Sequence, residues 1–227
     1  MSASYPEPTE LSTERRYFSL EQVAQHLPQP ELPISDDALE QYLNALYRLG
    51  RLRHTPNISP QNVVFLNELL HQHQPKRILE LGCANGYSTL RLWQIARAWQ
   101  AQIVTMDLSR PAFDEAQHHF TTLGAPIEAH FGNALELLPH IHARTPEGFD
   151  FIFIDAQKAL TLDLYLRARP LAAAGGLIVI DDVLKFRHKM RNFYDYLAEH
   201  RIAHHIRPLP DDDDGVMLIQ LESFLSK

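Results

Sequence analysis

The amino-acid sequence predicts an α/β fold with a doubly wound, mostly parallel sheet, an antiparallel hairpin at its C-terminal edge and a helical N-terminal extension. Two observations support this prediction. From about residue 76 onward, short apolar runs alternate with helix-compatible segments, which is typical of strands buried between two layers of helices. The last two apolar runs have no helix between them, so we expect them to pair as an antiparallel hairpin.

Length, composition and charge limit the class of protein. At 227 residues with 45% hydrophobic content, the chain fits one domain with an appendage, and we assign residues 1–58 to a partly helical extension and 59–227 to the main domain. A net charge of −7 argues against wholesale nucleic-acid or membrane binding. The single cysteine, Cys83, excludes an internal disulfide, and we recognise no signal peptide or membrane-spanning stretch. These features predict a cytoplasmic protein without a membrane partner.

Three helices are expected before the alternating region, each begun by a serine. Ser19 opens a short helix with the spacing of a capping box. Ser35 caps a second helix, which we expect Gly50 to end. The leucine stripe of this helix, in residues 39–49, indicates either core or the surface of a homodimer. Ser59, followed by a proline, starts the third helix.

The alternating region contains five expected strands, and we place a helix after each of them. The apolar runs cover residues 77–81, 103–106, 127–131, 149–154 and 177–180. The helices are expected to begin near residues 86, 109, 133, 159 and 186. The terminal hairpin joins residues 203–209 to 216–221 through an acidic run that ends at Asp214, and we interpret this run as a solvated turn.

A glycine loop follows the first strand. Gly82 and Gly86 lie in the run E-L-G-C-A-N-G, directly before an expected helix. Glycines at such a turn allow the backbone to approach a ligand, and the helix N-terminus attracts an anion. The spacing is not the G-x-G-x-x-G of dinucleotide enzymes, and a plain turn would also use glycines, but the strand before it and the acidic Glu80 favour a Rossmann-like binding loop. Asp107 ends the second strand, where an acid binds ribose hydroxyls or caps the next helix.

Four segments together resemble a known family. They are E-L-G-C-A-N-G-Y-S-T at residues 80–89, G-N-A-L-E at 132–136, D-A-Q-K at 155–158 and G-G-L-I-V-I-D-D-V-L at 175–184. Over roughly residues 58–221 the sequence is similar to the class I, metal-dependent O-methyltransferases of the caffeoyl-CoA and catechol type. The resemblance implies S-adenosylmethionine as cofactor, with Ser88 on its methionine carboxylate, Asp107 on its ribose, and Asn133 and Ala134 beside its adenine. The full set of expected cofactor-binding residues is Glu80, Gly82, Ala84, Gly86, Tyr87, Ser88, Asp107, Asn133, Ala134 and Asp155.

Three acidic residues close the fourth and fifth expected strands. Asp155 ends one, and Asp181 and Asp182 end the other. If these strands are neighbours, the carboxylates repel one another unless a cation or a proton intervenes, and a hard divalent ion such as Mg²⁺ would suit them. Unrelated strand-end caps are the alternative. The resemblance implies a metal triad with asparagine at position 182, so the aspartate there either strengthens cation binding or pairs with Lys158 or Lys185 in place of the metal.

Lys158 follows Asp155 by three residues. In the family that it resembles, a lysine at this spacing takes or steers the proton of the substrate hydroxyl, so Lys158 and Asp155 are the expected catalytic pair. A surface lysine at a helix start is the alternative interpretation.

Two departures from the family concern the acceptor. The insertion that usually follows the fifth strand is missing, and Thr161 and Leu164 stand where tyrosines are expected. A basic stretch at residues 185–191 takes the place of the insertion and indicates either phosphate binding, as on coenzyme A or RNA, or a solvated helix face.

The function that the sequence favours is methyl transfer from S-adenosylmethionine to a hydroxyl of a small acceptor, with a divalent metal that orients the acceptor. Methylation of an RNA hydroxyl and non-catalytic binding of S-adenosylmethionine are the alternatives. The expected partners are the small hydroxylated acceptor, a phosphate-bearing acceptor and a second copy of the chain in a homodimer.

Overall fold

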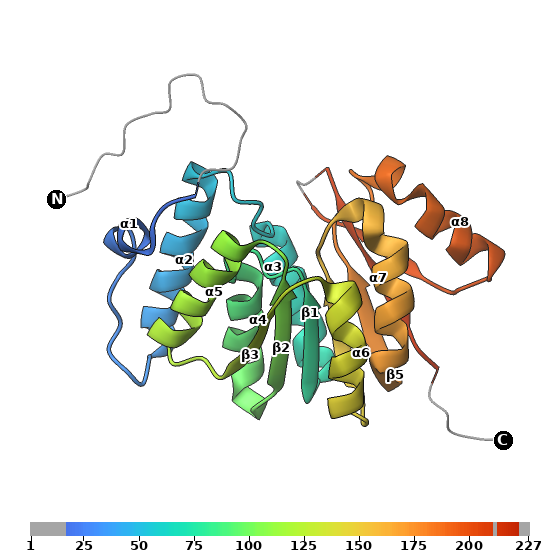
Figure 1. Cartoon of the computed structure of the whole chain (residues 1–227), viewed down its shortest axis with the longest axis horizontal. Helices are drawn as coiled ribbons and strands as arrows, with labels where there is room; N and C mark the ends of the chain where they lie inside the picture. The colour runs from blue at the N-terminus through green and yellow to red at the C-terminus, as the bar shows by residue number, and fades with distance from the viewer. Residues whose placement is uncertain (1–16, 211–212, 223–227) are drawn as a thin grey trace.

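A seven-stranded sheet forms the centre of the computed structural model, which describes residues 17–210 and 213–222 (Figure 1). Its strand order is β3-β2-β1-β4-β5-β7-β6. The first five strands are parallel, while β7 runs antiparallel to both β5 and β6. The predicted Rossmann-like sheet with its antiparallel edge hairpin is therefore confirmed. The strands are β1 (Arg77–Leu81), β2 (Gln102–Asp107), β3 (Ile127–Phe131), β4 (Phe149–Ile154), β5 (Ala172–Ile180), β6 (His205–Pro208) and β7 (Gly215–Gln220).

Eight α-helices surround the sheet in the described residues. They are α1 (Leu20–Gln25), α2 (Asp36–Leu52), α3 (Pro60–His73), α4 (Tyr87–Ala96), α5 (Arg110–Thr122), α6 (Ala134–Arg144), α7 (Thr161–Ala168) and α8 (Arg191–Glu199). The side chains of Ser19, Ser35 and Ser59 cap the first three, as their spacing predicts. The prediction that Gly50 ends the second helix is wrong, because α2 continues to Leu52.

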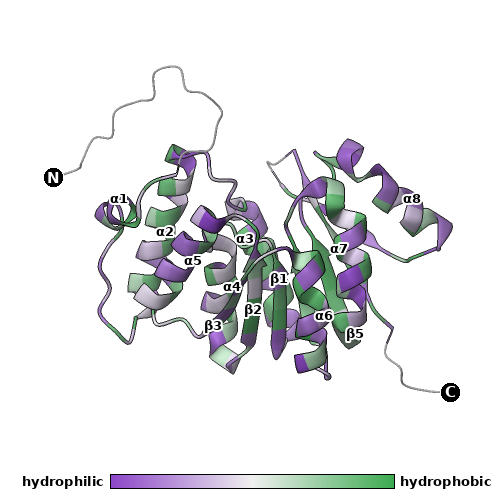
Figure 2. Cartoon of the chain, in the orientation of Figure 1, coloured by the Kyte–Doolittle hydropathy of each residue, from purple (hydrophilic) through white to green (hydrophobic). Residues whose placement is uncertain are grey.

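The strands alternate their side chains between two apolar cores, one on each face of the sheet. Ile78, Phe151 and Val179 belong to the core that α1–α5 cover, whereas Leu79 and Ile178 belong to the core that α6–α8 cover. Figure 2 shows the same division as hydrophobic strands enclosed by helices that are polar on the outside. This alternation follows from the period of two in a strand, and it explains why the parallel strands read as continuous apolar runs.

The N-terminal extension packs into the first of these cores. Four leucines of α2 are buried there, which favours the core interpretation of its stripe: Leu39, Leu43, Leu46 and Leu49. Arg53, just after α2, forms a buried ion pair with Glu115 of α5. Within the described residues, none of the helices has both the length and the apolar character needed to cross a membrane.

The acidic turn before β7 differs from its prediction. Asp211 and Asp212 lie outside the described residues, and Asp213 is exposed, but Asp214 is 4% exposed. Its Oδ1 accepts hydrogen bonds from the backbone N–H groups of Leu184 and Gly215 at 2.9 and 2.7 Å. The last aspartate of the run therefore ties the hairpin to the end of β5, and the interpretation of a fully solvated turn is wrong.

Candidate active site

The glycine loop owes its shape to contacts with the protein itself. Gly82 has φ +96°, and a Cβ there would lie 2.3 Å from the carbonyl oxygen of Asp155. Gly86 has φ +84°, and a Cβ there would lie 2.8 Å from the Phe120 ring. Both positions require glycine because of positive φ and close approach. The close approach that these glycines allow is to β4 and α5, so a ligand is not needed to explain them.

Glu80 lies beneath this loop and is fully buried. Its carboxylate accepts hydrogen bonds from the hydroxyls of Ser88 and Thr105, both at 2.6 Å, and from the hydroxyl of Thr89. Burial raises the pKa of Glu80 to about 7, although the hydrogen bonds from Ser88, Thr105 and Thr89 lower it. Glu80 therefore joins β1, β2 and the first turn of α4, and acts as a support for the loop.

Asp107 connects the same loop to the start of α5. Its Oδ2 accepts from the backbone N–H of Ala84 at 2.8 Å, and its Oδ1 accepts from the N–H of Ser109 at 2.7 Å. The Ser109 side chain makes no capping hydrogen bond. Asp107 thus caps the start of α5, which was the alternative interpretation of this residue. Because each carboxylate oxygen accepts more than one hydrogen bond, it retains capacity for ribose hydroxyls.

A cavity of about 680 Å³ opens at the carboxyl ends of β1, β2, β4 and β5. This is the edge of an open α/β sheet where ligands bind. Seven of the ten predicted cofactor residues line it: Gly82, Ala84, Ser88, Asp107, Asn133, Ala134 and Asp155.

The other three predicted cofactor residues, Glu80, Gly86 and Tyr87, are not part of its lining. Tyr87 lines a different hollow, where its hydroxyl accepts from Arg91 Nε at 3.2 Å and its ring lies 5.4 Å from that of Tyr47. Glu80 and Tyr87 therefore have protein partners on either side of the loop, and contact of Glu80, Gly86 and Tyr87 with the cofactor stays a prediction.

The predicted catalytic pair meets at the floor of the cavity. Lys158 Nζ donates to Asp155 Oδ1 at 2.7 Å and lies 3.0 Å from Asp182 Oδ2. It also lies 3.4 Å from the carbonyl oxygen of Asp181. Burial alone would lower the pKa of Lys158, but the charges of Asp155, Asp182 and Asp181 raise it above its ordinary value. The Lys158 side chain is 13% exposed, and its ammonium ion stands between two carboxylates in the wall of the cavity.

The three aspartates predicted as metal ligands do not come together as a ligand set. Among the described residues, no three acidic, histidine or cysteine side chains are grouped closely enough to hold one ion. Asp155 and Asp182 instead face the Lys158 ammonium, and Asp182 adopts a left-handed φ of 59°. The predicted neighbourhood of the two strands is confirmed, since β4 pairs with β5. The predicted metal site is not confirmed, and the residues as placed do not fit a divalent cation.

Residues that the sequence did not single out complete the cavity wall. Pro56, Asn57 and Ile58 come from the loop between α2 and α3, and Leu108 lies beside Asp107. A Cβ on Gly50 would lie 2.3 Å from Asn57 Nδ2. The absence of a side chain on Gly50 therefore allows the loop between α2 and α3 to pack against α2. A glycine inside an expected helix was the one feature of the sequence that could have indicated this contact.

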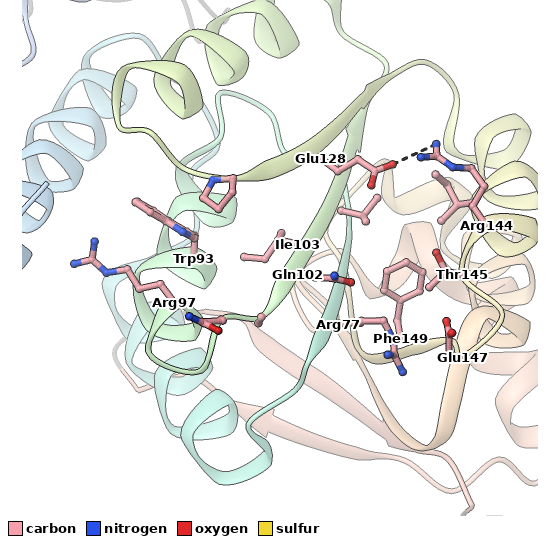
Figure 3. Close-up of a pocket in the computed structure, with 15 residues that line it drawn as sticks. Arg77, Trp93, Arg97, Gln102, Ile103, Glu128, Arg144, Thr145, Glu147 and Phe149 are labelled. Carbon is pink, nitrogen blue, oxygen red and sulfur yellow. Dashed lines mark ion pairs between the residues drawn. The ribbon is translucent and has the colours of Figure 1, made fainter. Parts of the chain in front are cut away.

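A second hollow, of about 710 Å³, lies at the opposite, amino ends of the strands (Figure 3). Three of its charged groups have protein partners: Arg144 pairs with Glu128 at 3.4 Å, and Arg77 Nε donates to the carbonyl of Gly148. No group of side chains there resembles the Lys158 cluster. Size alone does not locate the chemistry, and the carboxyl-end cavity is the candidate active site.

Comparison with known proteins identifies the family of the chain. The O-methyltransferase family profile matches residues 33–209. A catechol O-methyltransferase of Niastella koreensis is 33% identical over 158 residues, which are 68% of this chain and 69% of that protein. A caffeoyl-CoA O-methyltransferase of Eucalyptus gunnii is 30% identical over 66% of this chain and 68% of its own.

Among solved structures, an O-methyltransferase from Bacillus cereus in complex with SAH has the same fold. It superposes with a TM-score of 0.70 at 23% identity, over 90% of this chain and all of that one. The resemblance in the sequence motifs is thereby confirmed, and the chain belongs to the O-methyltransferase family.

Proposed function

We propose that this protein transfers the methyl group of S-adenosylmethionine to a hydroxyl of a small acceptor. The observation that carries the proposal is the single cavity that joins Ser88 and Asp107 at one end to Lys158 and Asp155 at the other. S-adenosylmethionine would extend from Asp107, at its ribose, toward the β4 end. The acceptor hydroxyl would then lie beside the Lys158 ammonium, with its oxygen in line behind the methyl group.

The transfer needs an oxygen nucleophile and a place for its proton. The acceptor oxygen forms a bond to the methyl carbon while the sulfur–carbon bond breaks, which leaves neutral S-adenosylhomocysteine. The hydroxyl proton passes to a carboxylate of the cluster, Asp155 or Asp182. Lys158, held as an ammonium ion by both, stabilises the developing negative charge on the oxygen. The lysine therefore steers the proton rather than accepting it.

The divalent cation that the family resemblance implies is not part of this mechanism, because Lys158 already bridges Asp155 and Asp182. Methyltransferase activity measured in EDTA and with added Mg²⁺ tests directly whether the reaction needs a divalent cation. Activity that disappears in EDTA and returns with Mg²⁺ would restore the metal hypothesis.

Replacement of Lys158 tests the proposal. Lys158→Met should lower kcat by about 10²–10⁴-fold, the range for a group that manages proton transfer and charge. Binding of S-adenosylhomocysteine, measured by calorimetry, should stay within a factor of about three, because Lys158 lies at the acceptor end. The exposed Lys76 supplies the matched control as Lys76→Met. Binding without any turnover in the wild type would instead identify a non-catalytic binding protein.

One observation favours a phosphate-bearing acceptor, including RNA, as a second candidate. Lys189 and Phe186 line the cavity, with the Lys189 ammonium 5.0 Å from the Phe186 ring centre. Lys185 instead pairs with Asp213 at 2.8 Å, and Arg187 stacks on Tyr194. If Lys189 binds phosphate, Lys189→Ala should raise the KM for a phosphorylated acceptor and reduce the salt dependence of KM. No salt dependence would leave the uncharged small acceptor as the substrate.

A further inference from the structure

The loop between α2 and α3 forms one wall of the cofactor cavity. Pro56, Asn57 and Ile58 line this cavity, and they also line a smaller cavity of about 260 Å³ that adjoins it. None of these three residues belongs to a helix or a strand. Their position therefore depends on how the chain is held at the two ends of the loop.

Arg53, the residue that follows α2, holds the start of this loop in the core. It is 1% exposed, and its two terminal nitrogens donate to the two carboxylate oxygens of Glu115 at 2.9 and 2.5 Å. The backbone turns directly after it: His54 has a φ of 55°, and the N–H of Thr55 donates to the carbonyl of Gly50 at 2.8 Å. The ion pair therefore fixes the point from which the loop leaves α2.

The partner of Arg53 lies on the helix that also supports the glycine loop. Glu115 belongs to α5, which lies on the same face of the sheet as α2 (Figure 1). On the same helix, Ala116 and Phe120 face Gly86, at 3.1 and 2.8 Å from where a Cβ on this glycine would lie. Helix α5 thus contacts the glycine loop directly and the loop between α2 and α3 through Arg53. One helix therefore sets the distance between two walls of the cofactor cavity.

The surroundings of the Arg53–Glu115 pair indicate what it contributes. Both side chains are almost fully buried, and the Arg53 guanidinium lies over the Phe18 ring, 5.3 Å from its centre. Removal of two charges from water costs about as much as their attraction returns, so apolar side chains of similar size often replace a buried pair without loss of stability. The guanidinium fork, however, fits a carboxylate in one orientation. A fixed orientation is what this pair adds to an apolar contact.

We propose that the Arg53–Glu115 pair positions the loop between α2 and α3 for S-adenosylmethionine, so that both are positioning residues for the methyl transfer. Neither residue lines the cofactor cavity. This inference rests on the proposed function. It makes the N-terminal extension part of the cofactor site, and it predicts an effect on cofactor affinity rather than on the chemical step.

The experiment separates cofactor binding from stability in a variant without the buried charges. In the full chain, Arg53→Met combined with Glu115→Gln should keep the fold, because no unpaired charge remains in the core. Its Kd for S-adenosylhomocysteine, measured by calorimetry, should be at least about tenfold above that of the wild type. With catechol as acceptor and both substrates saturating, kcat should stay within a factor of about three. An unchanged Kd in this double variant would overturn the inference.

Tyr42→Phe is the matched control. The Tyr42 hydroxyl and His119 Nδ1, 2.8 Å apart, form a second buried contact between α2 and α5, but Tyr42 lies inside α2 rather than at its end. Loss of this hydroxyl should lower the free energy of unfolding, while the Kd for S-adenosylhomocysteine stays within a factor of about three. A rise in Kd as large as in the double variant would overturn the inference, because any damage between the two helices would then weaken binding.

A second variant moves the loop without a change of charge. A Cβ on Gly50 would lie 2.3 Å from Asn57 Nδ2, so Gly50→Ala displaces the Asn57 side chain from its place in the cavity wall. Alanine inside a helix is favourable, and this variant should fold. Its Kd for S-adenosylhomocysteine should rise at least about threefold. If the double variant does not fold, an unchanged Kd in Gly50→Ala overturns the inference instead.

Failure of the proposed function is separately visible in the same samples. A wild type that does not bind S-adenosylhomocysteine contradicts the proposed function and the inference together. A wild type that binds it and methylates a hydroxyl, while the variants bind it equally well, retains the proposed function and loses only the positioning role of the pair.

Discussion

Two buried glutamates in this chain have opposite electrostatic surroundings. Glu80, under the glycine loop, accepts hydrogen bonds from three neutral hydroxyls. Glu115, on α5, accepts from both terminal nitrogens of Arg53 at 2.5 and 2.9 Å. Burial raises the pKa of Glu80 to about 7. Burial would also raise the pKa of Glu115, but the neighbouring His119 imidazole, 3.5 Å away, and the Arg53 guanidinium lower it to about 2.

The difference teaches what it takes to bury a charge. Hydroxyl donors satisfy the lone pairs of Glu80, yet they leave the desolvation of its negative charge partly uncompensated. The guanidinium of Arg53 adds a full opposite charge in bidentate geometry. The hydroxyl donors around Glu80 thus support the glycine loop with a carboxyl group whose pKa lies near neutral pH. The arrangement around Glu115 gives a permanent ion pair that fastens the N-terminal extension to the domain.

Removal of the cation should have the largest effect. Arg53→Met leaves Glu115 buried without a counter-charge and should lower the free energy of unfolding by about 3–5 kcal/mol. Chemical denaturation measures this change. The double variant Arg53→Met with Glu115→Gln should recover a large part of the loss, because no charge then remains buried. A loss below about 1 kcal/mol for Arg53→Met would show that the pair behaves like a surface contact.

The two glutamates should also give opposite slopes of stability against pH. The pKa of Glu115 in the folded protein, about 2, is below its ordinary value of 4.5, so its stabilisation is complete above pH 4.5 and disappears as pH falls toward 2. The pKa of Glu80, about 7, is above 4.5, so its ionisation destabilises the fold progressively between pH 4.5 and 7. In a plot of the free energy of unfolding against pH, these two effects give an acidic limb below pH 4.5 and a second limb between pH 4.5 and 7. The free energy of unfolding should change by about 3 kcal/mol across each limb.

Single substitutions separate the two limbs. Glu115→Gln should flatten the acidic limb alone, and Glu80→Gln should flatten the limb between pH 4.5 and 7 alone. Denaturation at several pH values measures both. If a limb persisted after the glutamate assigned to it had been replaced, other titrating groups would be its cause.

Sequence reasoning was most successful where one local rule decides the outcome. The strands at residues 77–81, 127–131 and 149–154 are confirmed to the residue, because short runs rich in apolar residues between helix-compatible segments have few other solutions. The serine caps are confirmed for the same reason: their spacing alone specifies the hydrogen bond. Asp155 and Asp182 both reach Lys158 because β4 pairs with β5, a neighbourhood that the doubly wound sheet predicts.

Features that depend on contacts between residues far apart in the sequence could not be predicted from the sequence. Arg53 and Glu115 are 62 residues apart, and nothing near either residue marks the other as its partner. Asp214 stands in a run of acids that reads as a solvated turn, yet its hydrogen bonds to residues of the β5–α8 connection bury it. Glu80 and Tyr87 belong to the loop motif, but which motif side chains face the cavity depends on the packing of α4 against its neighbours.

The hydroxyl donors of Glu80 offer a smaller test of the same comparison. Thr105→Val keeps the shape of the side chain but removes a hydrogen bond of 2.6 Å to the carboxylate. The loss should be about 0.5–1.5 kcal/mol at pH 5, where Glu80 is neutral, and about 1.5–3 kcal/mol at pH 9, where the bond is charge-assisted. Denaturation at both pH values measures the difference. Equal losses would mean that Glu80 does not ionise within this range.

Disruption of an exposed ion pair should change the free energy of unfolding least, and it provides a reference for the effects at the buried glutamates. Arg207 and Glu68 are 3.0 Å apart, and their side chains are 46% and 53% exposed. Water and salt screen such a pair, so Glu68→Gln should change the free energy of unfolding by less than about 1 kcal/mol, and by less still in 1 M salt. The change is measured under the same conditions as Arg53→Met. If Glu68→Gln were as damaging as Arg53→Met, burial could not be the reason that Glu115 depends on its arginine. The contrast between the two buried glutamates would then need another cause.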